Sequence, residues 1–89
     1  MNERLRWRDG LEWVDVDDEV VVHDLAGGQL HRLNPTAATV WRACDDRSFT
    51  AIVESVQRVY AGDAAVIARD VRTVVEAFLA AALVEASDD

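Results

Sequence analysis

The stretch QLHRLNPTAATVWRACDD, residues 29–46, decides how the two halves of this chain meet. Residues 29–33 are predicted to form a short strand. Asn34 is a good N-cap, and Pro35 suits the first helical position, where its missing N–H costs nothing and its fixed φ fits a helix. A strand is therefore expected to lead directly into a helix.

The helix that starts at Pro35 carries one apolar face. Its members recur at helical spacing and are Ala37, Val40, Trp41 and Cys44. We expect Trp41 and Cys44 to be core residues. Asp45 and Asp46 are expected to end the helix through turn chemistry, because acidic residues oppose the dipole at a helix C-terminus.

Length and composition limit the possible functions. With 89 residues the chain is expected to form one domain, too small for a deep, enclosed active site. A hydrophobic fraction of 51% and a single proline argue against disorder, even at a net charge of −8. The 17 acidic and 9 basic residues disfavour binding to a phosphate backbone. We therefore expect no nucleic-acid partner.

The single cysteine, Cys44, excludes an intramolecular disulfide framework. No apolar run approaches the roughly 20 residues of a membrane span, and no segment is typical of a signal peptide. We therefore expect a cytoplasmic protein without membrane contact.

Three strands are predicted in the N-terminal half, after a flexible segment over residues 1–10. They cover Leu11–Val16, Glu19–Asp24 and Gln29–Leu33, and short turns join them into an antiparallel meander. The last strand has no later strand to pair with, so one of its sides is expected to be an open edge. Trp7 and Trp13 can pack or anchor a partner, and the sequence leaves that choice open.

Two further helices are predicted in the C-terminal half. Residues 46–48 are expected to form a loop, and Ser48 is a plausible N-cap for a helix to about Tyr60. Asp63 can cap a third helix over residues 64–82. An acidic tail over residues 86–89 is expected to follow a domain that spans residues 11–85.

The apolar residues of the last helix cover an arc of about 220°, much wider than the ~100° stripe that one core requires. One part is expected to be core and contains Val71, Val75, Phe78 and Leu79. The other part contains Val66, Ile67, Val74 and the small Ala77 and Ala81, with Asp70 among them. This second side is a candidate groove wall.

Four segments of the chain resemble the PqqD-like proteins, the precursor-peptide recognition elements of ribosomal peptide natural-product pathways. The segments are HRLNPTAATVW, ACDD, SFTAIVESV and RDVRTVVEAFLAAALVE. The resemblance covers residues from about 11 to 85. Its most specific word is LNPTAA, residues 33–38, followed by Trp41 and by Asp70-Val71. The chain departs from the family at Asp45-Asp46, where Asp-Gly is usual, and at Ala82, where glycine is usual.

The resemblance implies an α+β fold similar to a winged helix-turn-helix, with a three-stranded antiparallel sheet followed by three helices. It also implies that a precursor's leader segment binds as an added strand beside the third strand, over a groove walled by the third helix. The residues implied on the strand are Gln29, Leu30, His31, Arg32 and Leu33, and those on the helix are Val66, Ile67, Asp70, Val71 and Val74.

The implied partners are the leader peptide and a maturation enzyme. A free-standing protein of this size resembles the recognition proteins of lasso-peptide pathways, which deliver the precursor to a leader peptidase. Similar free-standing proteins serve radical-SAM maturases, which is the alternative pathway.

Several of these residues have a plain structural alternative. Leu30 and Leu33 can be core residues of the sheet, and His31 can be solvated. Arg32 can be solvated or can pair with an acidic leader residue while its stem covers apolar surface. Asp70 can simply benefit from the helix dipole, or it can bind a basic leader residue.

The sequence provides little for catalysis. His23 and His31 lie eight residues apart, Cys44 is alone, and the chain has no His-Glu helix motif or glycine-rich phosphate loop. Asp15, Asp17 and Asp18 lack the glycine and distal glutamate of a calcium loop. We expect no enzymatic activity, no cofactor and no metal site.

Two other classes of function remain open. A DNA-binding winged helix is suggested by the helix pair over residues 35–45 and 48–60, although the second helix carries too little positive charge for recognition. The other is a homodimer that pairs residues 29–33 with their own copy. Our expectation is a monomer with an available edge, or at most a weak dimer.

Overall fold

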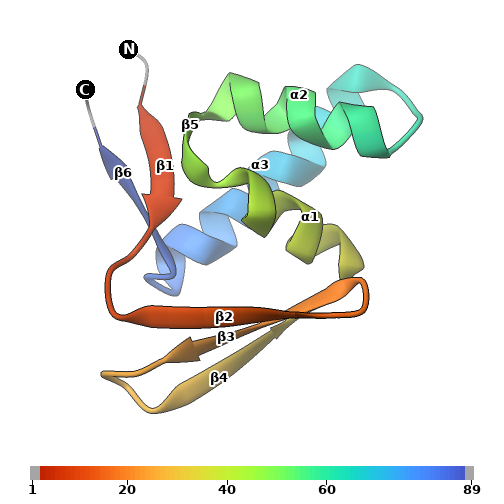
Figure 1. Ribbon diagram of the computed structural model, residues 1–89. Helices are drawn as coiled ribbons and strands as arrows, with labels where there is room; N and C mark the ends of the chain where they lie inside the picture. Colours follow the sequence, from red (N-terminus) through yellow and green to blue (C-terminus); the bar gives the residue numbers. More distant parts are fainter. Residues whose placement is uncertain (1–2, 88–89) are drawn as a thin grey trace.

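Two small antiparallel sheets and three helices make up this computed structural model, which describes residues 3–87 (Figure 1). The elements are β1 (Arg4–Trp7), β2 (Leu11–Val16), β3 (Glu19–Asp24), β4 (Gln29–Leu33), α1 (Pro35–Ala43), β5 (Asp45–Ser48), α2 (Phe49–Val59), α3 (Ala64–Ala80) and β6 (Val84–Ser87). The predicted α+β class, with a three-stranded sheet and three helices, is confirmed.

The larger sheet is the predicted meander, in the order β2-β3-β4. The β-branched run of β3 lies at its centre, where Val22 is opposite Trp13 on β2 and His31 on β4. Val20 and Val22 are fully buried because every second residue of β3 faces the helices. Figure 1 shows this sheet as one layer with the helices on one side of it.

The smaller sheet, in the order β5-β1-β6, corrects the prediction for three segments. β1 lies in the start that was expected to be flexible, β5 replaces the expected loop, and β6 extends into the expected tail. Each strand has only four residues, and β5 has no apolar residue. Even the alternating Arg4–Trp7 is too short to identify a strand by its periodicity alone. Burial of Leu5 and Val84 stabilises this sheet, and Figure 1 shows β1 and β6 side by side near the chain ends.

All three helix caps are the predicted ones. Asn34 Oδ1 accepts from the N–H of Ala37 at 2.8 Å, and Ser48 Oγ accepts from Ala51 at 3.2 Å. Asp63 Oδ1 accepts from the N–H groups of Ala65 and Val66. However, α1 ends at Ala43, earlier than predicted, because Asp45 already pairs with Arg6 in the smaller sheet.

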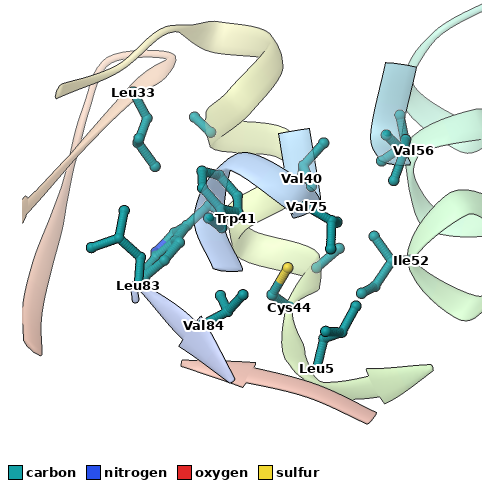
Figure 2. Packing of buried hydrophobic residues seen from close by; sticks show 14 of the residues in the cluster. Leu5, Leu33, Val40, Trp41, Cys44, Ile52, Val56, Val75, Leu83 and Val84 are labelled. Carbon is teal, nitrogen blue, oxygen red and sulfur yellow. The ribbon is translucent and has the colours of Figure 1, made fainter. Parts of the chain in front are cut away.

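Trp41 lies at the centre of the core and is fully buried, as is Cys44, so both predictions are confirmed (Figure 2). The rings of Trp7, Trp13 and Phe78 surround Trp41 at centroid distances of 5.9, 6.2 and 5.5 Å. Trp7 Nε1 also donates to the Trp41 carbonyl oxygen at 3.0 Å. Trp7 and Trp13 thus both pack against the core while each stays partly exposed.

The two sides predicted for α3 are present, although not every residue lies on its expected side. Val71, Val75 and Phe78 are buried, whereas Val66 is exposed. Leu79 was expected in the core but is 39% exposed. It lines a surface groove beside Phe49 and Ala86, at the unpredicted smaller sheet. Within residues 3–87, no helix combines the length and apolar character needed to cross a bilayer.

Candidate peptide-binding site

β4 forms an edge of the larger sheet. It pairs with β3 on one side, and no other strand of the described residues pairs with its second side. The backbone N–H and C=O groups along such an edge are available to an added strand. The predicted open edge is therefore confirmed for the described part of the chain.

The side chains of β4 alternate between two faces of the sheet. His31 and Leu33 are opposite Val22 and Val20, on the face that the helices cover, and Leu33 is only 8% exposed. Leu30 lies on the outer face and is 70% exposed. Leu33 is consequently a core residue, whereas the side chain of Leu30 is accessible to a partner.

Arg32 has a partner that sequence reasoning missed. Its Nε donates to Glu19 Oε1 at 3.0 Å, across the β3–β4 pair. The arginine side chain is 75% exposed, so this ion pair contributes little stability and is readily exchanged. Arg32 is available to an acidic ligand only in competition with Glu19.

A pocket of about 270 Å³ lies beside α3, near the end of β4. Four of the five predicted α3 residues line it, namely Val66, Ile67, Asp70 and Val71. Val74 is half-buried against the core and does not line this pocket. The structure thus brings most of the predicted helix wall together but separates Val74 from it.

The pocket also has walls that the sequence did not predict. They are Thr36 and Val40 from α1, Val56 from α2, and the connection 60–63 between α2 and α3, which begins with the C-cap Tyr60. Helical periodicity identifies one face of one helix, whereas this pocket needs the packing of three. Thr36 follows Leu33 by three residues, so the pocket begins shortly after the C-terminal end of β4.

Both charged residues that line the pocket are acidic. The Asp63 side chain is used to cap α3. Asp70 is exposed and makes no side-chain hydrogen bond or ion pair within residues 3–87. The pocket is therefore apolar inside, with an unengaged carboxylate at its rim.

The single cysteine and the two histidines are the residues with the best-known catalytic potential. Burial raises the pKa of the Cys44 thiol to about 12, so it is protonated at neutral pH and is a poor nucleophile. His23 and His31 occupy opposite faces of the sheet. No group of three or more His, Cys, Asp or Glu side chains in the described residues is arranged to bind a metal ion.

Comparison with known proteins agrees with this architecture. Residues 19–84 match the family described as "Coenzyme PQQ synthesis protein D (PqqD)". The chain belongs to the PqqD family. The matched region of this PqqD-family chain includes the β4 edge and the pocket of α3. No curated protein is similar enough in sequence to be matched.

Two solved structures share the fold. One is described as "TbiB1 in Complex with the TbiA(beta) Leader Peptide", with a TM-score of 0.82 and 25% identity over 94% of the PqqD-family chain and 99% of the other. The second is described as "Lasso peptide synthetase B1 complexed with the leader peptide", with a TM-score of 0.78 and 20% identity over 92% and 98%. The resemblance to a winged helix-turn-helix stays a prediction.

Proposed function

We propose that this PqqD-family protein binds the leader segment of a ribosomally synthesised precursor peptide as a fourth strand beside β4. The observation that carries the proposal is the open β4 edge next to an apolar pocket. A similar fold of 25% identity has been solved with a leader peptide. Main-chain hydrogen bonds would supply general affinity, and side-chain pockets would supply sequence choice.

The proposed contact surface has two parts. The strand contributes backbone groups, and its exposed side chains on the outer face flank the added strand. The proposed residues are Gln29, Leu30, His31, Arg32 and Leu33 on β4, and Val66, Ile67, Asp70, Val71 and Val74 on α3. The buried Leu33 and Val71 would contribute backbone groups or a pocket floor rather than an exposed side chain.

In this proposal the protein has no catalytic activity of its own and acts in the cytoplasm as a monomer. It holds the precursor where a second protein, the leader peptidase of a lasso-peptide pathway, can reach it. The sequence resemblance to free-standing recognition proteins supports that pathway. Delivery to a radical-SAM maturase is the alternative, and a cleavage assay with each enzyme separates the two.

The test is a fluorescence anisotropy titration of the protein into a labelled leader from a short precursor gene beside its own. Single N-methyl groups are then placed at successive leader positions. An added strand directs alternate N–H groups toward β4, so every second N-methyl group should weaken binding. N-methyl groups that weaken binding without this alternation would contradict strand addition. Absence of any binding to the leader would contradict leader recognition.

A further inference from the structure

The pocket beside α3 is large enough to hold a side chain, and no residue of β4 lines it. At about 270 Å³ it is far larger than the space that one water needs. Val40, Val56 and Val71 line it and are each at most 3% exposed, so it reaches the core. A long aliphatic stem can therefore pack against these walls.

The charge of the residues that line the pocket indicates which class of side chain it can bind. The pocket walls contain no Lys or Arg, and the Asp70 carboxylate has no partner within residues 3–87. The Asp70 carboxylate would repel an anionic group, and a purely aliphatic group would leave the carboxylate without a partner. An aliphatic stem that lies along the apolar walls can return its terminal cation to the rim, beside the Asp70 carboxylate.

We propose that the pocket binds a lysine or arginine side chain of the leader, with its stem between Val66 and Ile67 and its cation at Asp70. This inference rests on the proposed leader binding and adds the chemical class of an anchor residue. The whole-chain charge of −8 would further favour a basic ligand over an acidic one.

The fold also predicts where in the leader this residue lies. β4 runs toward α1, and the pocket follows the C-terminal end of β4 through Thr36. A strand antiparallel to β4 has its N-terminal end at that point. The basic residue should therefore precede the added strand in an antiparallel complex, and follow it only in a parallel one.

The first test uses n-butylguanidinium as a probe and the isosteric, neutral n-butylurea as its control. We expect the cation to shift the backbone amide NMR signals around Tyr60, Val66 and Asp70, and to bind about two- to fivefold more weakly to Asp70→Asn. Glu76→Gln is the matched control, because it removes the same charge from an exposed position of α3 outside this pocket. High salt should reduce the difference between the two probes.

Three results of that test would overturn the proposal, and the first two concern the probes on the native protein. One is equal binding of the cation and the urea to the native protein, since the carboxylate would then have no role. The other is the absence of shifts at the pocket amides at millimolar probe. Equal losses in Asp70→Asn and Glu76→Gln would also overturn it, because general charge rather than the pocket would explain the binding.

The second test uses the leader peptide, with each Lys and Arg replaced singly by the neutral glutamine or citrulline. One of these replacements should weaken leader binding to the native protein about fivefold. The same replacement should not weaken leader binding to Asp70→Asn, because a double-mutant cycle of a direct pair shows no second loss. A leader that binds equally well without its basic residues would overturn the anchor but leave strand addition intact. A leader that does not bind at all would overturn both proposals for the leader.

Discussion

Arg8 and Asp24 form an ion pair, with 3.2 Å between Arg8 Nη2 and Asp24 Oδ2. Arg8 lies between the two sheets, and Asp24 ends β3 at the turn into β4. The Arg8 side chain also donates to the Ala82 carbonyl oxygen after α3. One partly buried arginine thus connects the proposed binding hairpin to the smaller sheet and to the end of α3.

The first prediction concerns acid stability. The Gly27 N–H donates to Asp24, and with the nearby Arg8 it lowers the pKa of Asp24 below its ordinary value of 3.8. A carboxylate with a depressed folded-state pKa stabilises the fold above the unfolded pKa, and this contribution is lost as the pH falls through the folded value. Thermal unfolding should therefore show a loss of stability below about pH 4 that is smaller in Asp24→Asn. The same acid sensitivity in both proteins would contradict this role of Asp24.

The second prediction concerns Ala82, which has a φ of 57° at the end of α3. The N–H of Leu83 donates to the Phe78 carbonyl and that of Ala82 to the Leu79 carbonyl, which is a Schellman motif with alanine at the position that favours glycine. Because a left-handed conformation strains a side chain with a Cβ atom, Ala82→Gly should stabilise the fold by about 0.5–1 kcal/mol in urea unfolding.

Asp46 provides the comparison for Ala82, since its φ is 55°. Aspartate tolerates the left-handed region better than alanine does. Asp46→Gly should therefore change the free energy of unfolding by less than Ala82→Gly. The two glycines that the family usually carries and this chain lacks correspond to these two positions. An Ala82→Gly protein that is less stable than the native one would show that backbone strain is not the controlling term.

The third prediction concerns the hydrogen bond from Trp7 Nε1 to the Trp41 carbonyl. Trp7→Phe keeps an aromatic ring but removes the donor, and should cost about 1 kcal/mol or more through the lost bond and lost ring contact. Trp13→Phe is the control, because Trp13 also packs on Trp41 but makes no such hydrogen bond within residues 3–87. Equal costs for both variants in urea unfolding would show that ring packing alone matters.

The fourth prediction separates the groove wall from the core of α3. Val66 is 44% exposed, so Val66→Lys should leave the fold intact while it weakens leader binding by about 1 kcal/mol or more through lost apolar contact. Val59→Lys is the control at an exposed position on α2 outside the pocket, and should leave leader affinity unchanged. Val71→Lys buries a charge and should unfold the domain. Unfolding of Val66→Lys would place that residue in the core.

The same change at Val74 tests the remaining helix residue. Val74 is half-buried and lies off the pocket, although the sequence placed it on the groove wall. If its exposed part contacts the leader, Val74→Lys should weaken binding in the anisotropy titration without loss of the folded circular dichroism signal. A folded variant with native affinity would remove Val74 from the contact surface.

The predictable parts of the fold depended on local signals. Asn34, Ser48 and Asp63 each cap a helix through groups within three residues, and the valine run of β3 favours a buried strand by itself. The smaller sheet depends on partners far away in the sequence, such as Leu5 opposite Ala86. Local sequence patterns extend over a few residues, so they cannot include both members of such a pair.

The same limit applies to the site. The open β4 edge followed from the order of the strands, and the exposed side of α3 followed from its wide apolar arc. The pocket needs Thr36, Val56 and Val66 from three different helices. The Arg32–Glu19 pair needs the register of β3 and β4. Neither can be obtained without tertiary packing.

The placement of β1 between β5 and β6 has a consequence for how the molecule assembles. A nascent chain releases β1 first, yet its partner Val84–Ser87 emerges only after every helix has been made. Pairing so distant in sequence carries a high loop-closure cost and is slow compared with a local hairpin. The meander and the caps can form during synthesis, whereas the smaller sheet closes last. We therefore expect completion of the Trp41 core, which needs Trp7 from β1, to be a late event in folding.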